Sequence, residues 1–345
     1  MRVSSPFTAV GRFQNVWRLR ALLGEGNFGC VYEIKHRKSE RAGAVKILAV
    51  SEESMRQVAQ EEALIWRCIG QHRNIVKLHE VYEDNGLMFF VMEKCKCTVL
   101  SHLHSGFAMK NLPVLYHQML SGIAHLHHVN IAHRDIKLEN FLCATNSFDC
   151  VKLCDFGFAI EVPLGRSLKG VFGTPPYMSP EMLSGSYSLS TEIWSMGICC
   201  YYVHSGGRYP YEPRDKAAVT MKKAISEGSQ IIDFEAPKNV SFEAKQFTIA
   251  LLNRNPLGRP TAKEALRKQF ISSSLCSDVS LTPSEQSTVA SEQDRKAMSR
   301  ASGLEDVSEE SLGIEIAVNK VFTKEYASKI SVDKPSTVTR IIVAL

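Results

Sequence analysis

Short stretches of alternating apolar and polar residues fill the first quarter of the chain. They flank the glycines at positions 24, 26 and 29 and recur at 43–48, 76–82 and 87–92. An alternation with a period of two predicts β-strands, and the stretches on either side of the glycines predict a hairpin. We therefore expect a small, mainly antiparallel sheet at the start of the chain.

Apolar residues take helical spacing further along the chain. Residues 112–130 carry such residues at Leu115, Met119, Ile123 and Leu126. This spacing predicts a long buried helix. A short hairpin is expected within 141–154, a hydrophobic helix from about Ile193, and three or four further helices within 215–270. The larger part of the chain is therefore expected to be helical.

Both ends of the chain differ from its middle. Residues 1–16 are expected to form a short polar arm. Residues 272–345 are rich in Ser and Thr, with mixed charge and few aromatic residues, a composition that predicts disorder. An apolar patch in this tail, Leu312–Val318, alternates like a strand. It could dock as a peptide, or it could be a chance cluster, which we favour.

Composition narrows the class of function. The 345 residues are 44% hydrophobic, which is enough for a sizeable core, and the net charge of +5 comes from scattered basic residues. No apolar run approaches the roughly 20 residues of a membrane span, and the first residues lack the apolar core of a signal peptide. Several of the ten cysteines lie in apolar runs, where reduced cysteine packs as a small hydrophobe. We expect a cytoplasmic or nuclear protein that binds neither nucleic acid nor a membrane.

The candidate chemistry is concentrated in the stretch 133–140. Asp135, Lys137 and Asn140 place a carboxylate, an ammonium and an amide within six positions. Transfer of a γ-phosphoryl group uses such a set, because an Asp deprotonates the attacking hydroxyl, a Lys neutralises charge on the phosphate, and an Asn and a second Asp hold magnesium. Asp155, in an Asp-Phe-Gly triplet, can supply the second carboxylate.

With these two motifs the chain resembles the eukaryotic protein kinases of the Ser/Thr class. The resemblance covers about residues 17–271. It implies an α+β, bilobal protein-kinase fold, with a small, mainly antiparallel β N-lobe (17–93) that carries the αC helix and a larger helical C-lobe (98–271). It also implies ATP and Mg²⁺ and a protein substrate with a Ser or Thr acceptor. Lys137 marks the Ser/Thr class, and the segments around the two motifs look most like the calcium/calmodulin-dependent kinase group.

The resemblance places the phosphate anchor in the N-lobe. Lys46 lies within an apolar strand, where an ammonium is costly unless it has partners. In the family this Lys contacts the α/β-phosphates and a Glu on the αC helix, which is expected from about Ser51 to Cys68. Glu62 is the expected partner. Glu61 is the alternative, because adjacent helical residues point about 100° apart and only one of the two can face Lys46.

The resemblance further implies a glycine-rich loop over the phosphates and a hinge that reads adenine. The expected loop contacts are Leu23, Gly24, Glu25, Gly26, Asn27, Phe28, Gly29, Cys30 and Val31. Leu142 is expected on the floor of the adenine site opposite Ala44, with the backbone of Glu93 and Cys95 at the ring edge. This hinge is shorter than usual and lacks the acidic residue that meets the ribose.

The segment from Asp155 to Glu181 resembles the family's activation segment and ends in "GTPPYMSPE". Thr174 in this motif is expected to bond the catalytic Asp and Lys. Glu181 is expected to form a buried ion pair with Arg259, and Trp66 is expected to lie beside the Phe of the Asp-Phe-Gly triplet.

The resemblance is incomplete at three positions. Glu192 replaces an Asp that holds the catalytic-loop backbone. Tyr202 replaces a second acid that, together with a residue like Glu139, binds substrate arginines in basophilic relatives, so we expect only a weak basic preference. Ser167 is the only hydroxyl between the Asp-Phe-Gly triplet and Thr174. We expect it to be an ordinary loop serine rather than a phosphorylation switch.

Two other classes of function stay open from the sequence. A pseudokinase, acting as a scaffold, would fit Glu192 and the short hinge. A small-molecule phosphotransferase would fit the same fold but not the peptide-type segment that ends at Glu181. A regulatory partner could bind the C-terminal tail.

Overall fold

The structure is a computed structural model. It describes residues 12–26, 29–104, 112–163, 165–211, 213, 215, 217–228 and 240–276. The first residues of the arm, and the tail with its apolar patch at Leu312–Val318, lie outside the described residues.

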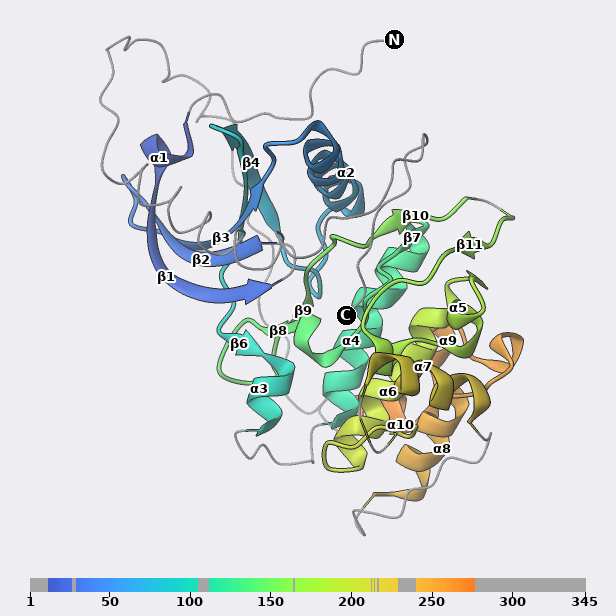
Figure 1. The fold of residues 1–345 in the computed structure, drawn as a ribbon. Helices are drawn as coiled ribbons and strands as arrows, with labels where there is room; N and C mark the ends of the chain where they lie inside the picture. Colours follow the sequence, from blue (N-terminus) through green and yellow to red (C-terminus); the bar gives the residue numbers. More distant parts are fainter. Residues whose placement is uncertain are drawn as a thin grey trace. The chain divides into compact units, whose positions relative to one another are not determined.

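Five strands form the antiparallel sheet of the N-lobe, in the order β1-β2-β3-β5-β4 (Figure 1). They are β1 (Trp17–Gly26), β2 (Gly29–His36), β3 (Ala42–Ala49), β4 (Leu78–Asp84) and β5 (Leu87–Met92). The register places Ala44 opposite Met92 and Val31 opposite Lys46. The phosphate anchor and the start of the hinge therefore belong to adjacent strands.

One long helix, α2 (Glu53–Ile69), packs against β4 and β5 (Figure 1). Its buried residues recur every three or four positions, so that one face of the helix meets the sheet. Glu62 lies on this face, whereas Glu61 is exposed. The expected αC helix is thus present.

Helices dominate the C-lobe. They are α3 (Val99–His104), α4 (Leu112–His128), α5 (Pro180–Leu183), α6 (Ser190–His204), α7 (Ala218–Glu227), α8 (Phe242–Leu251), α9 (Ala262–Leu266) and α10 (Gln269–Cys276), with three 3-10 turns, η2 (Leu138–Asn140), η3 (Pro175–Tyr177) and η4 (Pro256–Gly258). Short strands hold the loops. One sheet has three strands, in the order β6 (Cys97–Thr98), β8 (Phe141–Cys143) and β9 (Val151–Leu153), and two strand pairs join β7 (Ile131–Ala132) to β10 (Ile160–Glu161) and β11 (Leu168–Lys169) to β12 (Ser186–Tyr187). The small sheet and the helical lobe together give the expected bilobal kinase fold.

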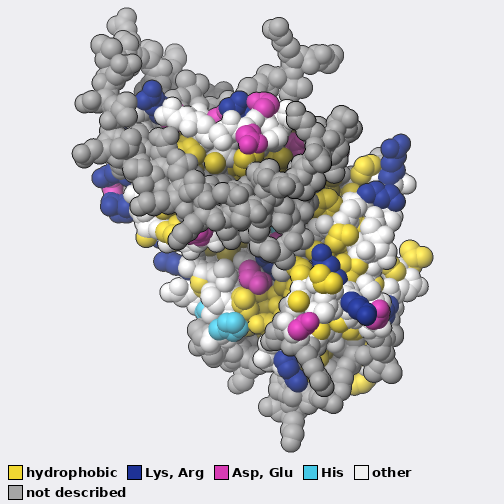
Figure 2. Space-filling view, viewed as in Figure 1, with side chains coloured by type: hydrophobic (Ala, Val, Ile, Leu, Met, Phe, Trp, Pro, Cys, Tyr) yellow, Lys and Arg dark blue, Asp and Glu magenta, His cyan; other side chains and the backbone are white. Residues whose placement is uncertain are grey.

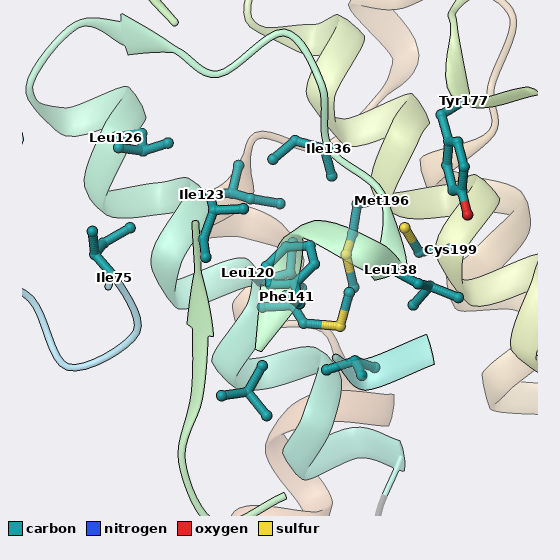
Figure 3. Packing of buried hydrophobic residues seen from close by; sticks show 14 of the residues in the cluster. Ile75, Leu120, Ile123, Leu126, Ile136, Leu138, Phe141, Tyr177, Met196 and Cys199 are labelled. Carbon is teal, nitrogen blue, oxygen red and sulfur yellow. The ribbon is translucent and has the colours of Figure 1, made fainter. Parts of the chain in front are cut away.

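The core of the C-lobe lies beneath the catalytic loop. Leu120 and Ile123 of α4 meet Ile136 and Leu138 of the loop, and Met196 of α6 closes the cluster (Figure 3). All five side chains are fully buried or nearly so. Burying such side chains stabilises the fold by about 1.5–3 kcal/mol each, and it fixes the backbone that carries the catalytic residues.

The structure adds a short helix before β1 and continues the last helix beyond residue 271. Residues Phe13–Val16 form a short helix, α1, rather than part of a polar arm. Phe13 is 1% exposed and stacks on Phe89 with a centroid separation of 4.5 Å. At the other end α10 continues to Cys276, and Ile271 belongs to the core. A helix of four residues is too short to show a period, so the sequence pattern missed α1.

The described surface shows no dominant charge on the face in Figure 2. Lys and Arg side chains of the described residues lie there in several separate places, with Asp and Glu side chains among them. None of the helices in the described part of the chain is long and apolar enough to cross a membrane.

Candidate active site

Asp135, in the loop between β7 and β8, is the centre of a hydrogen-bond network. Its Oδ1 accepts hydrogen bonds from the amide and the hydroxyl of Thr174, at 3.0 and 2.8 Å. Its Oδ2 lies 2.8 Å from Nζ of Lys137 and 3.1 Å from the side-chain nitrogen of Asn140. Nζ of Lys137 also donates to the Thr174 hydroxyl at 2.9 Å. Three residues predicted from the sequence therefore surround the carboxylate of Asp135.

Lys46 of β3 lies between two carboxylates. Its Nζ is 2.8 Å from Oε1 of Glu62 and 2.9 Å from Oδ1 of Asp155. Of the two candidates on the αC helix, the partner is thus Glu62 and not Glu61. Burial opposes the charge on Lys46, but Asp155 and Glu62 outweigh it and raise the pKa of the ammonium above its usual value. The lysine stays charged and is aimed at the place where phosphates would lie.

The pKa values of these two carboxyl groups, Glu62 and Asp155, shift in opposite directions. Burial raises the pKa of Glu62 despite its contact with Lys46, and the negative charge of Asp155 acts in the same direction as burial. For Asp155 burial acts in the same direction, but Lys46 outweighs it and lowers the pKa. Asp155 therefore remains an anion, as a metal ligand must.

Asn140 and Asp155 have oxygen atoms suited to magnesium. The side-chain nitrogen of Asn140 donates to the backbone oxygen of Asp135 at 2.8 Å, in addition to its bond to the carboxylate. This orientation leaves the side-chain oxygen of Asn140 without a hydrogen bond in the described part of the chain. Amide and carboxylate oxygens are the ligands that Mg²⁺ prefers, so the residues present fit the implied metal.

The Asp-Phe-Gly triplet is held by aromatic packing. Phe156 is fully buried, with its ring 5.1 Å from Trp66 and 5.4 Å from the ring of His133. The expected contact between Trp66 and Phe156 is present. Asp155 has a left-handed backbone, with φ of 63°, which costs energy in a residue other than glycine. The packing of Phe156 holds this conformation and directs the carboxylate of Asp155 toward Lys46.

Glu192 of α6 keeps the role expected of a shorter Asp. Its Oε1 accepts the backbone amides of His133 and Arg134 at 2.5 and 2.8 Å. Its Oε2 lies 2.8 Å from Nε2 of His127, at the end of α4. Burial alone would raise the pKa of Glu192, but the bonds from His127 and the Arg134 amide outweigh it and lower the pKa. The departure from the family pattern thus preserves the support of the catalytic loop.

His127 is a positioning residue that the sequence analysis missed. It was one of three histidines near the end of a predicted helix, and its partner lies 65 positions later in the chain. A helix-end histidine has no local pattern that identifies such a partner. Only the fold brings α4 and α6 together.

The glycine-rich hairpin joins β1 to β2 in the N-lobe sheet. Leu23, Gly24, Glu25 and Gly26 are exposed in β1, and Asn27 and Phe28 lie outside the described residues. Gly29 has a φ of 122°, and a Cβ atom there would collide with the carbonyl oxygen of Ile47. Only glycine fits this position, so the turn can lie close to β3. Cys30, the next residue, is buried.

The adenine side of the site is apolar. Ala44 and Met92 are buried, and Val31, Leu142 and Cys95 pack partly exposed against the same cluster. In the described part of the chain, the backbone oxygen of Glu93 and the backbone amide of Cys95 make no backbone hydrogen bond. An adenine ring presents a donor and an acceptor along one edge, so these two groups fit it.

The hinge is held by two ion pairs that the sequence did not predict. Lys94 lies 2.6 Å from Glu33 of β2, and Glu93 lies 3.0 Å from Lys152 of β9. They tie the hinge to strands on either side of the adenine site. These two contacts identify no residue that replaces the acidic residue expected to meet the ribose.

The activation segment is anchored at its end. Glu181 and Arg259 form a double hydrogen bond, with N–O distances of 2.5 and 2.9 Å, between residues 78 positions apart. The predicted ion pair is therefore confirmed. The guanidinium of Arg259 also lies 5.0 Å from the ring centre of Trp194. A bidentate pair of this kind fixes geometry as well as charge.

Arg134 meets an aromatic ring within the activation segment. Its guanidinium carbon lies 3.9 Å from the centroid of the Phe172 ring, and its Nε donates to the carbonyl oxygen of Phe158 at 2.6 Å. A guanidinium over an aromatic face is stabilised by the negative face of the ring.

Ser167 is exposed and accepts a hydrogen bond from Ser186 at 3.1 Å.

Comparison with known proteins agrees with this geometry. The family model of the protein kinase domain matches residues 17–271. The chain is 33% identical over 238 residues to Calcium-dependent protein kinase 5 of Plasmodium berghei (strain Anka), covering 68% of this chain and 42% of that protein. It is 31% identical over 256 residues to Calcium-dependent protein kinase 5 of Plasmodium falciparum (isolate 3D7), covering 73% and 44%.

A third relative carries a different kinase name. The chain is 29% identical over 267 residues to Serine/threonine-protein kinase PLK4 of Danio rerio, covering 75% of this chain and 27% of that protein. The chain thus spans less than half the length of the curated relatives it matches. The family model nevertheless covers most of the chain and includes every element of the site described above. The chain belongs to the protein kinase family.

Proposed function

We propose that this chain is an active kinase that transfers the γ-phosphate of ATP to Ser or Thr hydroxyls of protein substrates. The observation that carries the proposal is the network around Asp135. A carboxylate that is already bonded to Lys137, Asn140 and Thr174 is held in one orientation and needs no rearrangement before reaction. A scaffold that only binds other proteins has no need of such an arrangement.

The acceptor hydroxyl would lie within hydrogen-bond reach of Asp135. As its oxygen bonds to the γ-phosphorus, the bond from that phosphorus to the bridging oxygen breaks, ADP leaves, and the proton of the hydroxyl passes to the carboxylate. Lys137, on the same side, stabilises the negative charge of the transferred group. Thr174 holds the carboxylate and the ammonium together through its hydroxyl. These three residues position the nucleophile and the phosphate without any movement of the loop.

The nucleotide would be held from the N-lobe. Mg²⁺, when bound, neutralises phosphate oxygens and orients them for in-line transfer. Asn140 and Asp155 are the residues that would hold it. Lys46, fixed by Glu62, supplies a permanent positive charge for the α/β-phosphates. The apolar side chains around Ala44 and Leu142 exclude water from the adenine ring.

Two features support serine and threonine as acceptors. Lys137 stands two residues after Asp135, as in the Ser/Thr class, and its contact with Thr174 links the catalytic loop to the peptide-binding end of the activation segment. The relatives named above include a protein called a serine/threonine-protein kinase.

The test is a phosphorylation assay on matched peptides that differ only in a Ser, Thr or Tyr acceptor. The purified chain with Mg-ATP should phosphorylate the Ser and Thr peptides, and the Lys46→Met variant should not. Phosphorylation of the Tyr peptide alone would contradict the acceptor class. Binding of ATP without transfer to any protein or peptide would favour the pseudokinase instead.

A further inference from the structure

Three consecutive residues of the activation segment cover two consecutive residues of the catalytic loop. Thr174 bonds the carboxylate of Asp135 through its amide and its hydroxyl. Gly173 lies so close to Arg134 that a Cβ atom there would collide with the carbonyl oxygen of the arginine. The ring of Phe172 lies over the guanidinium of Arg134, whose carbon is 3.9 Å from the ring centroid. Residues 172–174 thus form a clamp, in which Phe172 contacts the side chain of Arg134.

The side chain of Arg134 joins two parts of the activation segment. Its Nε donates to the carbonyl oxygen of Phe158 at 2.6 Å, directly after the Asp-Phe-Gly triplet. The rings of Phe158 and Phe172 also meet, with centroids 6.4 Å apart and an angle of 59° between their planes. The residue that follows the triplet and the first residue of the clamp are therefore held on one guanidinium.

The backbone of Arg134 depends on contacts of this kind. Its φ of 65° lies in the left-handed region, which residues other than glycine seldom adopt. Such a conformation persists only where the surrounding structure holds it. Glu192 accepts the amide of Arg134, and Phe172 holds its guanidinium. Because Asp135 follows directly in the chain, a rotation of Arg134 would move the catalytic carboxylate.

The surroundings of Arg134 make the ring contact strong. The arginine is 5% exposed, so little water competes with the ring for the charge. The attraction between a desolvated guanidinium and an aromatic face corresponds to about 30-fold in an equilibrium constant. A neutral ring neither titrates nor needs a modification to make this contact. Phe172 can therefore hold Arg134 in the protein as synthesised.

The ring is confined by the chain that precedes it. A Cβ atom at Gly170 would collide with the edge of the Phe172 ring, so the backbone packs closely against it. Leu168 is 5% exposed and packs with Met178 and Met182, and β11 pairs with β12 at this point. The stretch that leads to the clamp is thus fixed independently of the ring. Phe172 itself is partly exposed, so replacing it should change the site rather than the fold.

We propose that Phe172 is a positioning residue for phosphoryl transfer. Its ring holds Arg134 by an uncharged contact, and Arg134 in turn fixes the direction of Asp135. This inference rests on the proposed kinase function. It assigns a role in turnover to a side chain that acts through Arg134 rather than on the substrate.

The first test compares the wild type with Phe172→Leu and Phe172→Tyr in a phosphorylation assay with Mg-ATP and a serine peptide. Leucine lacks the ring but still packs on the arginine stem, so kcat should fall about tenfold rather than by the full contact. KM for ATP should stay within about twofold, because Lys46 keeps its contacts. Tyrosine keeps the ring and should retain kcat within about threefold. Phe242→Leu, at a phenylalanine of α8 that is 72% exposed, is the matched control and should change neither constant.

Two further comparisons separate the cation–π contact from simple packing. Trifluorophenylalanine at position 172 keeps the shape of the ring but weakens its negative face, so kcat should fall at least about threefold with the fold unchanged. The same replacement at Phe242 should have no effect. In an Arg134→Gln background the Phe172→Leu change should cost less than about twofold, because residues that act as a unit are not additive.

The outcomes are distinguishable. A Phe172→Leu variant that is folded by circular dichroism and keeps kcat within about twofold of the wild type overturns the role. An unchanged kcat with the fluorinated ring overturns the contact with the guanidinium as its cause, and so do equal losses from Phe172→Leu with and without Arg134→Gln. The fluorinated ring decides the matter even if Phe172→Leu does not fold. A wild type that phosphorylates no peptide overturns the proposed kinase function instead.

Discussion

Replacing Glu192 by alanine should destabilise the catalytic loop more than any exposed substitution. The carboxylate is 1% exposed and accepts two backbone amides and one imidazole. Alanine would leave the amides of His133 and Arg134 buried without an acceptor. The loop would then have to shift in order to satisfy them, and Asp135 would move with it.

The magnitude follows from the bonds that are lost. A buried donor left unsatisfied costs about 1–3 kcal/mol, and a hydrogen bond from an imidazole contributes about 1 kcal/mol. Two amides and His127 together give a loss of about 3–7 kcal/mol in the free energy of unfolding. Glu192→Gln keeps an oxygen for both amides and loses only the charge, so its loss should be about 1–2 kcal/mol.

The measurement is chemical denaturation of the wild type, the two variants and the exposed control Glu243→Ala, followed by kcat for each folded protein. The pKa of Glu192 is lowered from 4.5 in the folded state. A group of this kind stabilises the fold above its unfolded pKa, and the contribution is lost as the pH falls through its folded pKa. The difference between the wild type and Glu192→Gln should therefore shrink below pH 4.5. An alanine variant within 1 kcal/mol of the wild type would refute the reasoning.

The remaining predictions concern the phosphate anchor, the activation segment and the tail. Lys46→Met should reduce turnover by more than about 100-fold with the fold retained, since its charge serves phosphates; turnover within about tenfold of wild type would refute the role. Ser167→Ala, and phosphatase treatment, should each change activity less than about threefold, because Phe172 and the carbonyl of Phe158 already meet the guanidinium of Arg134; a loss of about tenfold would identify Ser167 as a switch. Deleting residues 277–345, beyond the end of α10, should leave a folded and active domain by circular dichroism and peptide assay. An insoluble product, or activity raised manyfold, would show that the tail is structural or autoinhibitory.

The groups that perform chemistry could be predicted from the sequence because their spacing along the chain is short. Asp135, Lys137 and Asn140 lie on one loop, and the geometry of phosphoryl transfer restricts which residue types can stand there. Helical geometry, which turns adjacent side chains about 100° apart, allowed only one of Glu61 and Glu62 to face Lys46, and the resemblance to the family favoured Glu62. The sheet and the long helices could also be predicted, because their apolar residues recur at short, regular intervals along the chain.

The supporting contacts could not be predicted because they join residues far apart in the chain. His127 and Glu192 are 65 positions apart, and Arg134 and Phe172 are brought together only when the activation segment folds back. Phe13 packs on Phe89 from a segment without periodicity. Such contacts depend on tertiary packing, and neither local propensity nor residue spacing contains that information.

The central claim is tested most directly by the transfer of labelled γ-phosphate from ATP to a serine peptide, compared between the wild type and Asp135→Asn. Asparagine keeps the size of the side chain and removes the base, so both proteins should bind Mg-ATP with similar affinity. We predict that the wild type turns over and that the variant is slower by about 10²–10⁴-fold, the usual contribution of a general base. Equal rates in the two proteins, or a wild type that binds nucleotide and transfers nothing, would contradict the account.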